Sequence, residues 1–119
     1  MSLADVPLHA ADHDLASILA KSDPPESLVE HTWWVLSRLA DQRRLRRTLT
    51  TLTGSPRLWN WLYWGTFLHD FGKIADGFQA LLSGRKAEAQ AWGDHRHEAL
   101  SLAFVNWLFP GGHPDRAYV

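Results

Sequence analysis

The chain has 119 residues, 45% of them hydrophobic, and a formal net charge of -1. This length fits one small domain with a modest core and excludes two domains. Cysteine is absent, which excludes a disulfide framework, a thiolate zinc site and a cysteine nucleophile, so any metal must be held by histidine or carboxylate. The near-neutral charge means that binding to nucleic acid would need a local basic patch or a partner.

No apolar run approaches the roughly 20 residues that a membrane-spanning helix needs. Residues 1–11 also lack a basic region followed by an apolar segment, so no secretion signal is expected. We therefore expect a protein of the cytoplasm without a membrane partner.

All predicted elements are helices. A short helix is expected over residues 14–21, whose leucine and isoleucine side chains share one helical side. A long helix is expected over residues 24–47, with Asp23 as its N-cap and Pro24 in its first turn. Its apolar residues recur at helical spacing, and His31 falls within that apolar stripe.

The third expected helix, residues 56–70, is apolar nearly all round, which is typical of a central buried helix. The remaining elements are, in chain order, a short helix over 74–82, a polar surface excursion over 85–93, a helix over 94–109 capped by Asp94, and the first turn of a further helix over 115–119.

Three histidines and an aspartate carry the chemistry of a metal site. His69 and Asp70 are adjacent at the end of the third helix, so both can reach one centre. His31 and His97 lie on the apolar faces of two other helices. Histidine with carboxylate suits borderline divalent metals, and a carboxylate in this place can bridge two of them. The alternative for each histidine is a hydrogen-bonded place in the core.

The segment His69-Asp70-Phe71-Gly72-Lys73, with an earlier helical histidine and a later Arg-His-Glu, resembles the HD phosphohydrolase superfamily. Two further segments narrow this resemblance: Ala-Lys-Ser at 20–22 followed by Leu-Val-Glu-His-Thr at 28–32, and Arg-His-Glu-Ala-Leu-Ser at 96–101. Together they resemble the HD nuclease domain of the CRISPR-associated type I helicase-nuclease, over about residues 19–108.

This resemblance implies an all-α HD-domain helical bundle. It implies that His31, His69, Asp70 and His97 are metal ligands and that Lys73 sits beside the scissile phosphate, so Asp70 and Lys73 are the expected catalytic residues. The expected cofactor is a divalent transition metal, two per complete domain, with Mn, Fe, Co or Ni favoured and Mg or Zn as options. Glu98 is expected to support a ligand rather than to bind metal.

The family pattern continues with a paired His-His motif and a later aspartate, and the sequence has neither. His113 precedes a proline in a glycine-rich loop and matches neither motif. We therefore expect residues 1–119 to form the N-terminal part of a single HD nuclease domain, truncated at its C-terminus. Such a piece could bind one metal weakly and cut nothing by itself.

By the same resemblance, the expected function is hydrolysis of phosphodiester bonds in single-stranded DNA during CRISPR type I interference, an antiviral defence. The implied partners are a helicase domain, on the same or a separate chain, and an RNA-guided surveillance complex. Two alternatives stay open: an HD phosphohydrolase acting on nucleotides or cyclic nucleotides, and a catalytically incomplete HD module that serves assembly in a CRISPR complex.

Two further features of the long helix have two interpretations each. Adjacent Trp33 and Trp34 cannot both face inward, so one is either simply exposed or available to a base or a partner. A basic cluster at the end of the helix is either a solvated helix end or a contact for the backbone of single-stranded DNA. The cluster consists of Arg38, Arg43, Arg44, Arg46 and Arg47.

Overall fold

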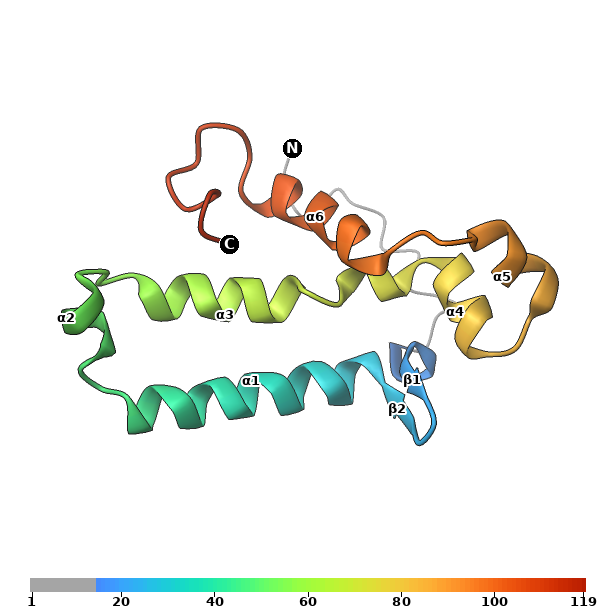
Figure 1. Cartoon of the computed structure of the whole chain (residues 1–119), viewed down its shortest axis with the longest axis horizontal. Helices are drawn as coiled ribbons and strands as arrows, with labels where there is room; N and C mark the ends of the chain where they lie inside the picture. The colour runs from blue at the N-terminus through green and yellow to red at the C-terminus, as the bar shows by residue number, and fades with distance from the viewer. Residues whose placement is uncertain (1–14) are drawn as a thin grey trace.

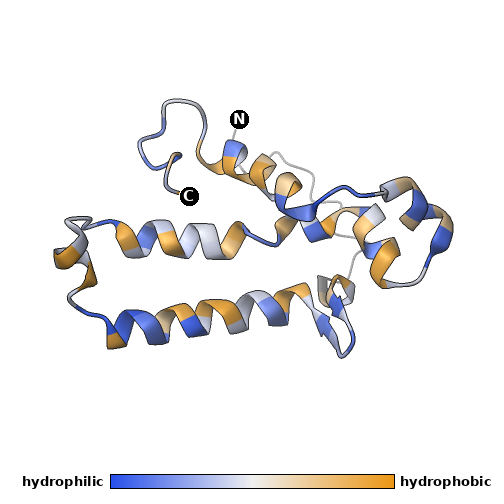
Figure 2. Ribbon diagram, viewed as in Figure 1, coloured by the Kyte–Doolittle hydropathy of each residue, from blue (hydrophilic) through white to orange (hydrophobic). Residues whose placement is uncertain are grey.

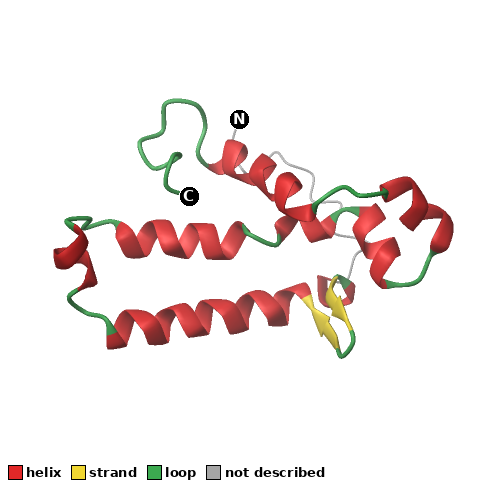
Figure 3. Ribbon diagram, in the orientation of Figure 1, coloured by secondary structure: helices red, strands yellow, loops and turns green. Residues whose placement is uncertain are grey.

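The computed structural model describes residues 15–119, and helices make up most of this range (Figures 1 and 3). The all-α fold class is thereby confirmed, with one small two-stranded sheet added. In chain order the elements are η2 (Leu15–Ser17), β1 (Leu19–Ser22), β2 (Pro25–Ser27), α1 (Leu28–Leu45), α2 (Leu49–Thr53), α3 (Leu58–Leu68), η3 (Phe71–Ile74), α4 (Asp76–Leu82), α5 (Lys86–Trp92) and α6 (His97–Leu108).

A β-hairpin occupies the place where the sequence predicted the end of one helix and the start of the next. β1 pairs antiparallel with β2, with Leu19 opposite Ser27. Within the described residues, the predicted helix over 14–21 is reduced to the short η2, and the cap at Asp23 and the start at Pro24 are wrong. Two consecutive prolines explain the error, because proline lacks an N–H and disfavours helical backbone at the residue before it.

A capping box one turn later starts α1. The Ser27 hydroxyl accepts a hydrogen bond from the Glu30 N–H at 3.1 Å, and the Glu30 carboxylate accepts one from the Ser27 N–H at 3.2 Å. These two bonds satisfy backbone donors that a helix start leaves free. Because α1 therefore begins at Leu28, His31 lies in its first turn.

Helices α1 and α3 lie side by side and run in opposite directions, joined by α2 (Figure 1). Helix α6 contacts both α3 and η3, and the turns after α6 contact α3 at Trp61, whose ring stacks on Tyr118. Of the α3 residues only Leu68 is buried, while Leu62 and Tyr63 are 38% and 43% exposed. The prediction of a central buried helix is therefore wrong for most of α3.

The C-terminal half departs from the prediction at three points. The expected excursion over 85–93 contains a helix, α5, whose Trp92 packs against α4: a Cβ added to Gly77 would lie 2.6 Å from the Trp92 ring. Helix α6 begins at His97 with Arg96 at its N-cap, so Asp94 does not cap it. Residues 115–119 form turns rather than a helix.

Buried residues gather in two places, near either end of α3. The larger group surrounds the junction of the hairpin, the start of α1 and the end of α3, and the smaller one contains Phe109 and Asp115. Elsewhere large side chains are open, among them Trp33 and Trp34 at 73% and 59% exposure, so both members of this pair face outward. Within residues 15–119, no helix combines the length and the apolar character that crossing a membrane requires.

Candidate metal centre

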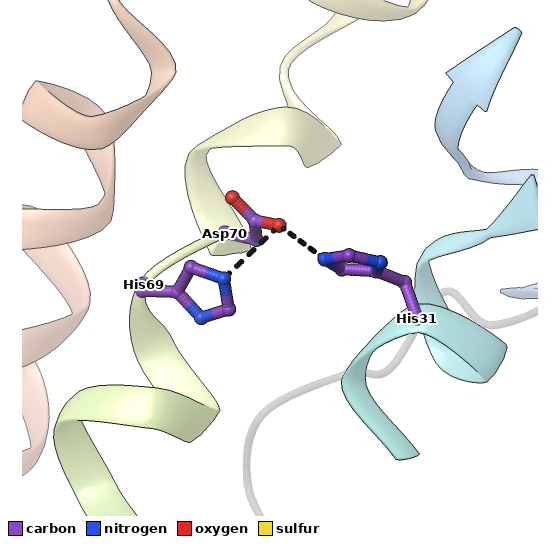
Figure 4. A group of neighbouring side chains, drawn as sticks. All are labelled: His31, His69 and Asp70. Atoms are coloured by element: carbon purple, nitrogen blue, oxygen red, sulfur yellow. Dashed lines mark ion pairs between the residues drawn. The ribbon is translucent and has the colours of Figure 1, made fainter. Parts of the chain in front are cut away.

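The carboxylate of Asp70 lies at the centre of the candidate site. Asp70 directly follows the C-cap of α3, and its side chain is only 7% exposed. Oxygen Oδ2 lies 3.1 Å from Nε2 of His31 and 3.2 Å from Nε2 of His69 (Figure 4), and oxygen Oδ1 lies 3.1 Å from Nε2 of His97. The structure thus brings together the four residues that the sequence predicted as metal ligands.

His31 reaches Asp70 from the first turn of α1 and is held from behind by the hairpin. Its Nδ1 lies 3.2 Å from the Oε2 atom of Glu26, a residue of β2. The same Glu26 oxygen lies 2.5 Å from the Lys21 ammonium on β1, and this hydrogen bond lowers the pKa of Glu26. A neighbouring carboxylate of this kind fixes the orientation of an imidazole and the position of its proton.

His69 forms the C-cap of α3, and its ring nitrogens have two different neighbours. Nδ1 lies 2.5 Å from the backbone carbonyl oxygen of Thr66, an atom that can only accept a hydrogen bond. Nδ1 therefore carries the proton, and Nε2 of the neutral ring presents a lone pair toward Asp70. Its side chain is 42% exposed, so this ligand lies on the open side of the centre.

The same reasoning applies to His31. Its Nδ1 faces the Glu26 carboxylate, so the neutral ring donates its proton there and Nε2 is left with a lone pair. In the neutral form of both rings, the Nε2 lone pairs of His31 and His69 therefore face one oxygen of Asp70. A cation placed among these three electron-rich atoms would bind all of them, whereas the Lys73 ammonium contacts the carboxylate oxygen alone.

His97 reaches the opposite oxygen of Asp70 from the start of α6. Its side chain is 19% exposed, and its ring lies against Phe78 of α4 with the ring centroids 4.9 Å apart. Its Nδ1 lies 3.5 Å from Glu98, a side chain that is 50% exposed. The hydrogen bond from Arg96 is the main reason why the pKa of Glu98 falls to about 2.

Lys73 projects from η3 onto the same carboxylate. Its ammonium lies 2.9 Å from Asp70 Oδ2, and its side chain is 12% exposed. Its backbone carbonyl accepts a hydrogen bond from the Gln79 amide at 2.6 Å, and the same amide bonds the backbone of Leu19 on β1. Gln79 thereby links η3 to the hairpin that supports His31.

A close contact between η3 and α6 fixes the relative positions of Asp70 and His97. The buried Ser101 hydroxyl accepts from the Gly72 N–H at 2.9 Å and lies 2.8 Å from the His69 carbonyl oxygen. A Cβ on Gly72 would lie 1.8 Å from the His97 carbonyl oxygen. Only glycine permits this approach, which explains the Gly of the His-Asp-x-Gly-Lys segment.

The electrostatics of the centre keep Asp70 ionised. Burial raises the pKa of Asp70, but the hydrogen bond from Lys73, the charge of Lys73 and the charges that His69 and His31 carry when protonated together outweigh burial and hold that pKa below its ordinary value. At neutral pH the carboxylate is therefore in the anionic form that binds a metal.

The donor set fits a divalent cation. One ligand atom each from His31, His69 and Asp70 lies within 4.8 Å of the others. Atoms that bind one ion at about 2.0–2.2 Å lie up to about 4 Å apart, so side-chain movements of about 1 Å would bring these three into a coordination shell. His97 is not in this group, because it faces the other oxygen of Asp70.

A family model decides the family of the chain. The model described as "Cas3, HD domain" matches residues 25–116, well over half of the sequence. The chain belongs to the Cas3 HD domain family. Membership implies a metal-dependent nuclease or phosphohydrolase domain of CRISPR defence, which bears out the resemblance seen in the sequence. No curated protein and no solved structure matches the chain.

Several residues of this Cas3 HD domain support the centre and were not found from the sequence. Glu26, Gln79 and Ser101 each contact a predicted site residue or its backbone. Ser101 fell inside the Arg-His-Glu-Ala-Leu-Ser segment, four residues after His97, which is the one signal that pointed to it. His95 is exposed and lies outside the cluster.

Proposed function

We propose that the chain hydrolyses phosphodiester bonds of single-stranded DNA in CRISPR type I interference, with Asp70 as the central metal ligand. The observation that supports this most strongly is the use of both Asp70 oxygens: one faces His31 and His69, and the other faces His97. A carboxylate between two sets of nitrogen donors suits a bridge between two cations.

In this proposal, His31, His69 and Asp70 would hold one divalent transition metal, and His97 with Asp70 would contribute to a second. Imidazole with carboxylate accepts Mn, Fe, Co or Ni, with Mg or Zn as options. When bound, such cations neutralise charge on a phosphate and acidify water at the site. Glu26 and the Thr66 carbonyl hold the protons of His31 and His69 away from the cations.

Lys73 is the proposed contact to the scissile phosphate. Its ammonium is fixed beside Asp70 at 2.9 Å and keeps a positive charge within reach of any anion at the centre. A fixed ammonium stabilises negative charge on phosphate oxygens without reorganising during the reaction. Asp70 and Lys73 are thus the proposed catalytic residues.

The proposal extends to partners and domain organisation through family membership alone. A Cas3 HD domain implies a nucleic acid substrate and a CRISPR context. We propose that a helicase domain, on the same or a separate chain, supplies the single strand, and that an RNA-guided surveillance complex recruits it. Residues 1–119 would then be part of one HD nuclease domain.

A cleavage assay on the metal-loaded chain tests the function. The purified chain is incubated with Mn²⁺ and end-labelled DNA, either single-stranded or duplex, and in parallel with nucleoside monophosphates and cyclic nucleotides. We expect cutting of the single strand, lost in His69→Ala and kept in His95→Ala, an exposed histidine of the same chain. Equal cutting by His69→Ala contradicts the proposal. No cutting by the metal-loaded chain also contradicts it and favours the catalytically incomplete HD module, whereas faster turnover of the small nucleotides favours a nucleotide phosphohydrolase.

A further inference from the structure

A second polar site lies at the end of the molecule away from Asp70. There the end of α1, helix α2 and the start of α3 enclose a hollow of about 300 Å³. In Figure 2 the end of α1 beside α2 is strongly hydrophilic. The hollow is lined by Arg43, Arg47, Thr50, Pro56, Trp59 and Asn60.

The two arginines of the hollow differ from the other arginines of the basic cluster. Arg44 and Arg38 pair with Asp41, and Arg46 donates a hydrogen bond to Gln42. Arg43 and Arg47 have no ion pair or side-chain hydrogen bond to any of residues 15–119. Arg43 lies in the last turn of α1 and Arg47 in the turn that follows the helix, and both line the hollow. Two like charges that meet at one hollow repel each other, which favours an anion there.

We propose that this hollow binds one nucleotide of a single-stranded DNA. Arg43 and Arg47 bind the phosphate, since guanidinium groups form paired hydrogen bonds with phosphate oxygens. The partly buried Trp59 offers a ring on which a base stacks, a contact that tolerates any base. Asn60 adds an amide that can both donate to and accept from a base edge.

The position of the hollow relates it to the metal centre. Twelve residues of helix rise separate His31 from Arg43, and ten separate Trp59 from His69, which correspond to about 18 Å and about 15 Å. Because α1 and α3 run side by side, both elements lead from the hollow to Asp70. The inference rests on the proposed function in one respect: the bound strand is the one that is cut at Asp70.

The inference predicts a specific loss of binding. Binding of a fluorescein-labelled single-stranded oligodeoxythymidine to the full chain is measured by anisotropy in EDTA, at several salt concentrations. We expect Arg43→Gln with Arg47→Gln to weaken binding at least about tenfold and to reduce the salt slope by about 0.7, the value for one lost phosphate contact. The matched control, Arg38→Gln with Arg44→Gln, removes the same charge from α1 and should change affinity less than about threefold.

Equal losses in the two double variants would overturn the site, because they would show attraction by charge alone. Trp59→Leu should also weaken binding about fivefold or more, the lower end for a lost base stack, whereas Trp33→Leu, an exposed tryptophan of α1, should not. Circular dichroism confirms that each variant is folded. Tighter binding of the matching oligoribonucleotide would overturn the assignment to DNA.

The failure of this inference can be told apart from failure of the proposed nuclease. EDTA removes the divalent cation that cleavage requires, so the anisotropy measurement reports binding at the hollow whether or not the metal-loaded chain cuts DNA. If the chain binds the oligonucleotide through Arg43 and Arg47 but never cuts DNA, the binding site is supported and the nuclease proposal is contradicted. If the chain cuts DNA and its affinity is unchanged by Arg43→Gln with Arg47→Gln, the nuclease proposal is supported and the binding site is contradicted.

Discussion

Two buried aspartates, one at each end of α3, have contrasting surroundings. Asp70 and Asp115 are both 5% exposed. Asp115 accepts hydrogen bonds from Arg57, at the N-cap of α3, and from the Trp61 indole at 2.8 Å. Asp70 instead faces three imidazoles and the Lys73 ammonium.

The contrast suits Asp115 to a role in the fold and Asp70 to the proposed role in metal binding. A negative charge at a helix N-terminus is stabilised by the helix dipole, whereas one beyond the C-terminus is destabilised. The dipole of α3 therefore stabilises the charged Asp115 carboxylate and destabilises that of Asp70. The partners of Asp115 are a guanidinium that stays protonated and an indole that only donates. The imidazoles at Asp70 can release a proton and bind a cation, which the partners of Asp115 cannot do.

The largest expected effect follows from Asp70→Asn. The amide keeps the size of the side chain but removes the charge and one oxygen, so metal binding should weaken by more than about 100-fold, the upper range for losing a residue that only supports a ligand. Elemental analysis and calorimetric titration with Mn²⁺ measure this. The control is Asp94→Asn at an exposed aspartate. Metal retained by the Asp70 variant would show that Asp70 is not a metal ligand.

Gly72→Ala should break the backbone contact beside Asp70. The new methyl group would lie 1.8 Å from the His97 carbonyl oxygen, so η3 and α6 must separate. We expect a loss of about 3 kcal/mol in the free energy of unfolding, at the upper end for overpacking because the contact is with backbone. Urea denaturation measures the loss, with Gly111→Ala as control, since a methyl group there meets nothing within 4 Å. Equal stability of the two variants would contradict the close approach.

Asp115→Asn should give the opposite result to Asp70→Asn. Loss of the charge weakens the hydrogen bonds from Arg57 and Trp61, and because Arg57 is half exposed we expect only about 2 kcal/mol of lost stability. Metal content should not change. If this variant lost metal and kept its stability, the division of roles between the two aspartates would be wrong.

The sequence predicted which side chains meet at Asp70 better than it predicted the residues that support them. His31, His69, Asp70 and His97 were found because histidine and aspartate on helical faces are a visible chemical pattern. Glu26 was missed because its role depends on the hairpin, and the hairpin was hidden by an apparent helix start at Pro24. Local spacing cannot show a partner that a turn brings back onto the next helix.

The fold was predictable in class and less so in burial. The helical ranges of α1, α4 and α6 follow from periodicity, with ends displaced where Ser27 or Arg96 replaced the expected cap. The apolar composition of α3 suggested burial on all sides, but composition does not say how much of a helix its neighbours cover. Within the described residues, α1, α6 and the C-terminal turns cover it only in part.

Glu26→Gln tests the support of His31. The amide still accepts from Nδ1 but no longer attracts the Lys21 ammonium or the imidazole proton as strongly. We expect metal affinity to fall about tenfold, the lower end for such a partner, with little change in stability. Glu88→Gln on α5 removes an exposed carboxylate away from the centre and serves as control. Unchanged affinity in Glu26→Gln would mean that His31 is oriented by α1 alone.

Glu98→Gln should have the smallest effect, although Glu98 is adjacent to His97 and Glu26 is not adjacent to His31. Glu98 lies 3.5 Å from Nδ1 of His97, is 50% exposed and already accepts two hydrogen bonds from Arg96. Water screens a pair so open, so metal affinity should change less than about threefold. Because Arg96 lowers the pKa of Glu98 to about 2, Glu98 stays charged above about pH 4, and this small effect should be the same from pH 5 to 8 in Mn²⁺ titrations. A loss as large as that of Glu26→Gln would show that sequence adjacency outweighs burial in supporting a ligand.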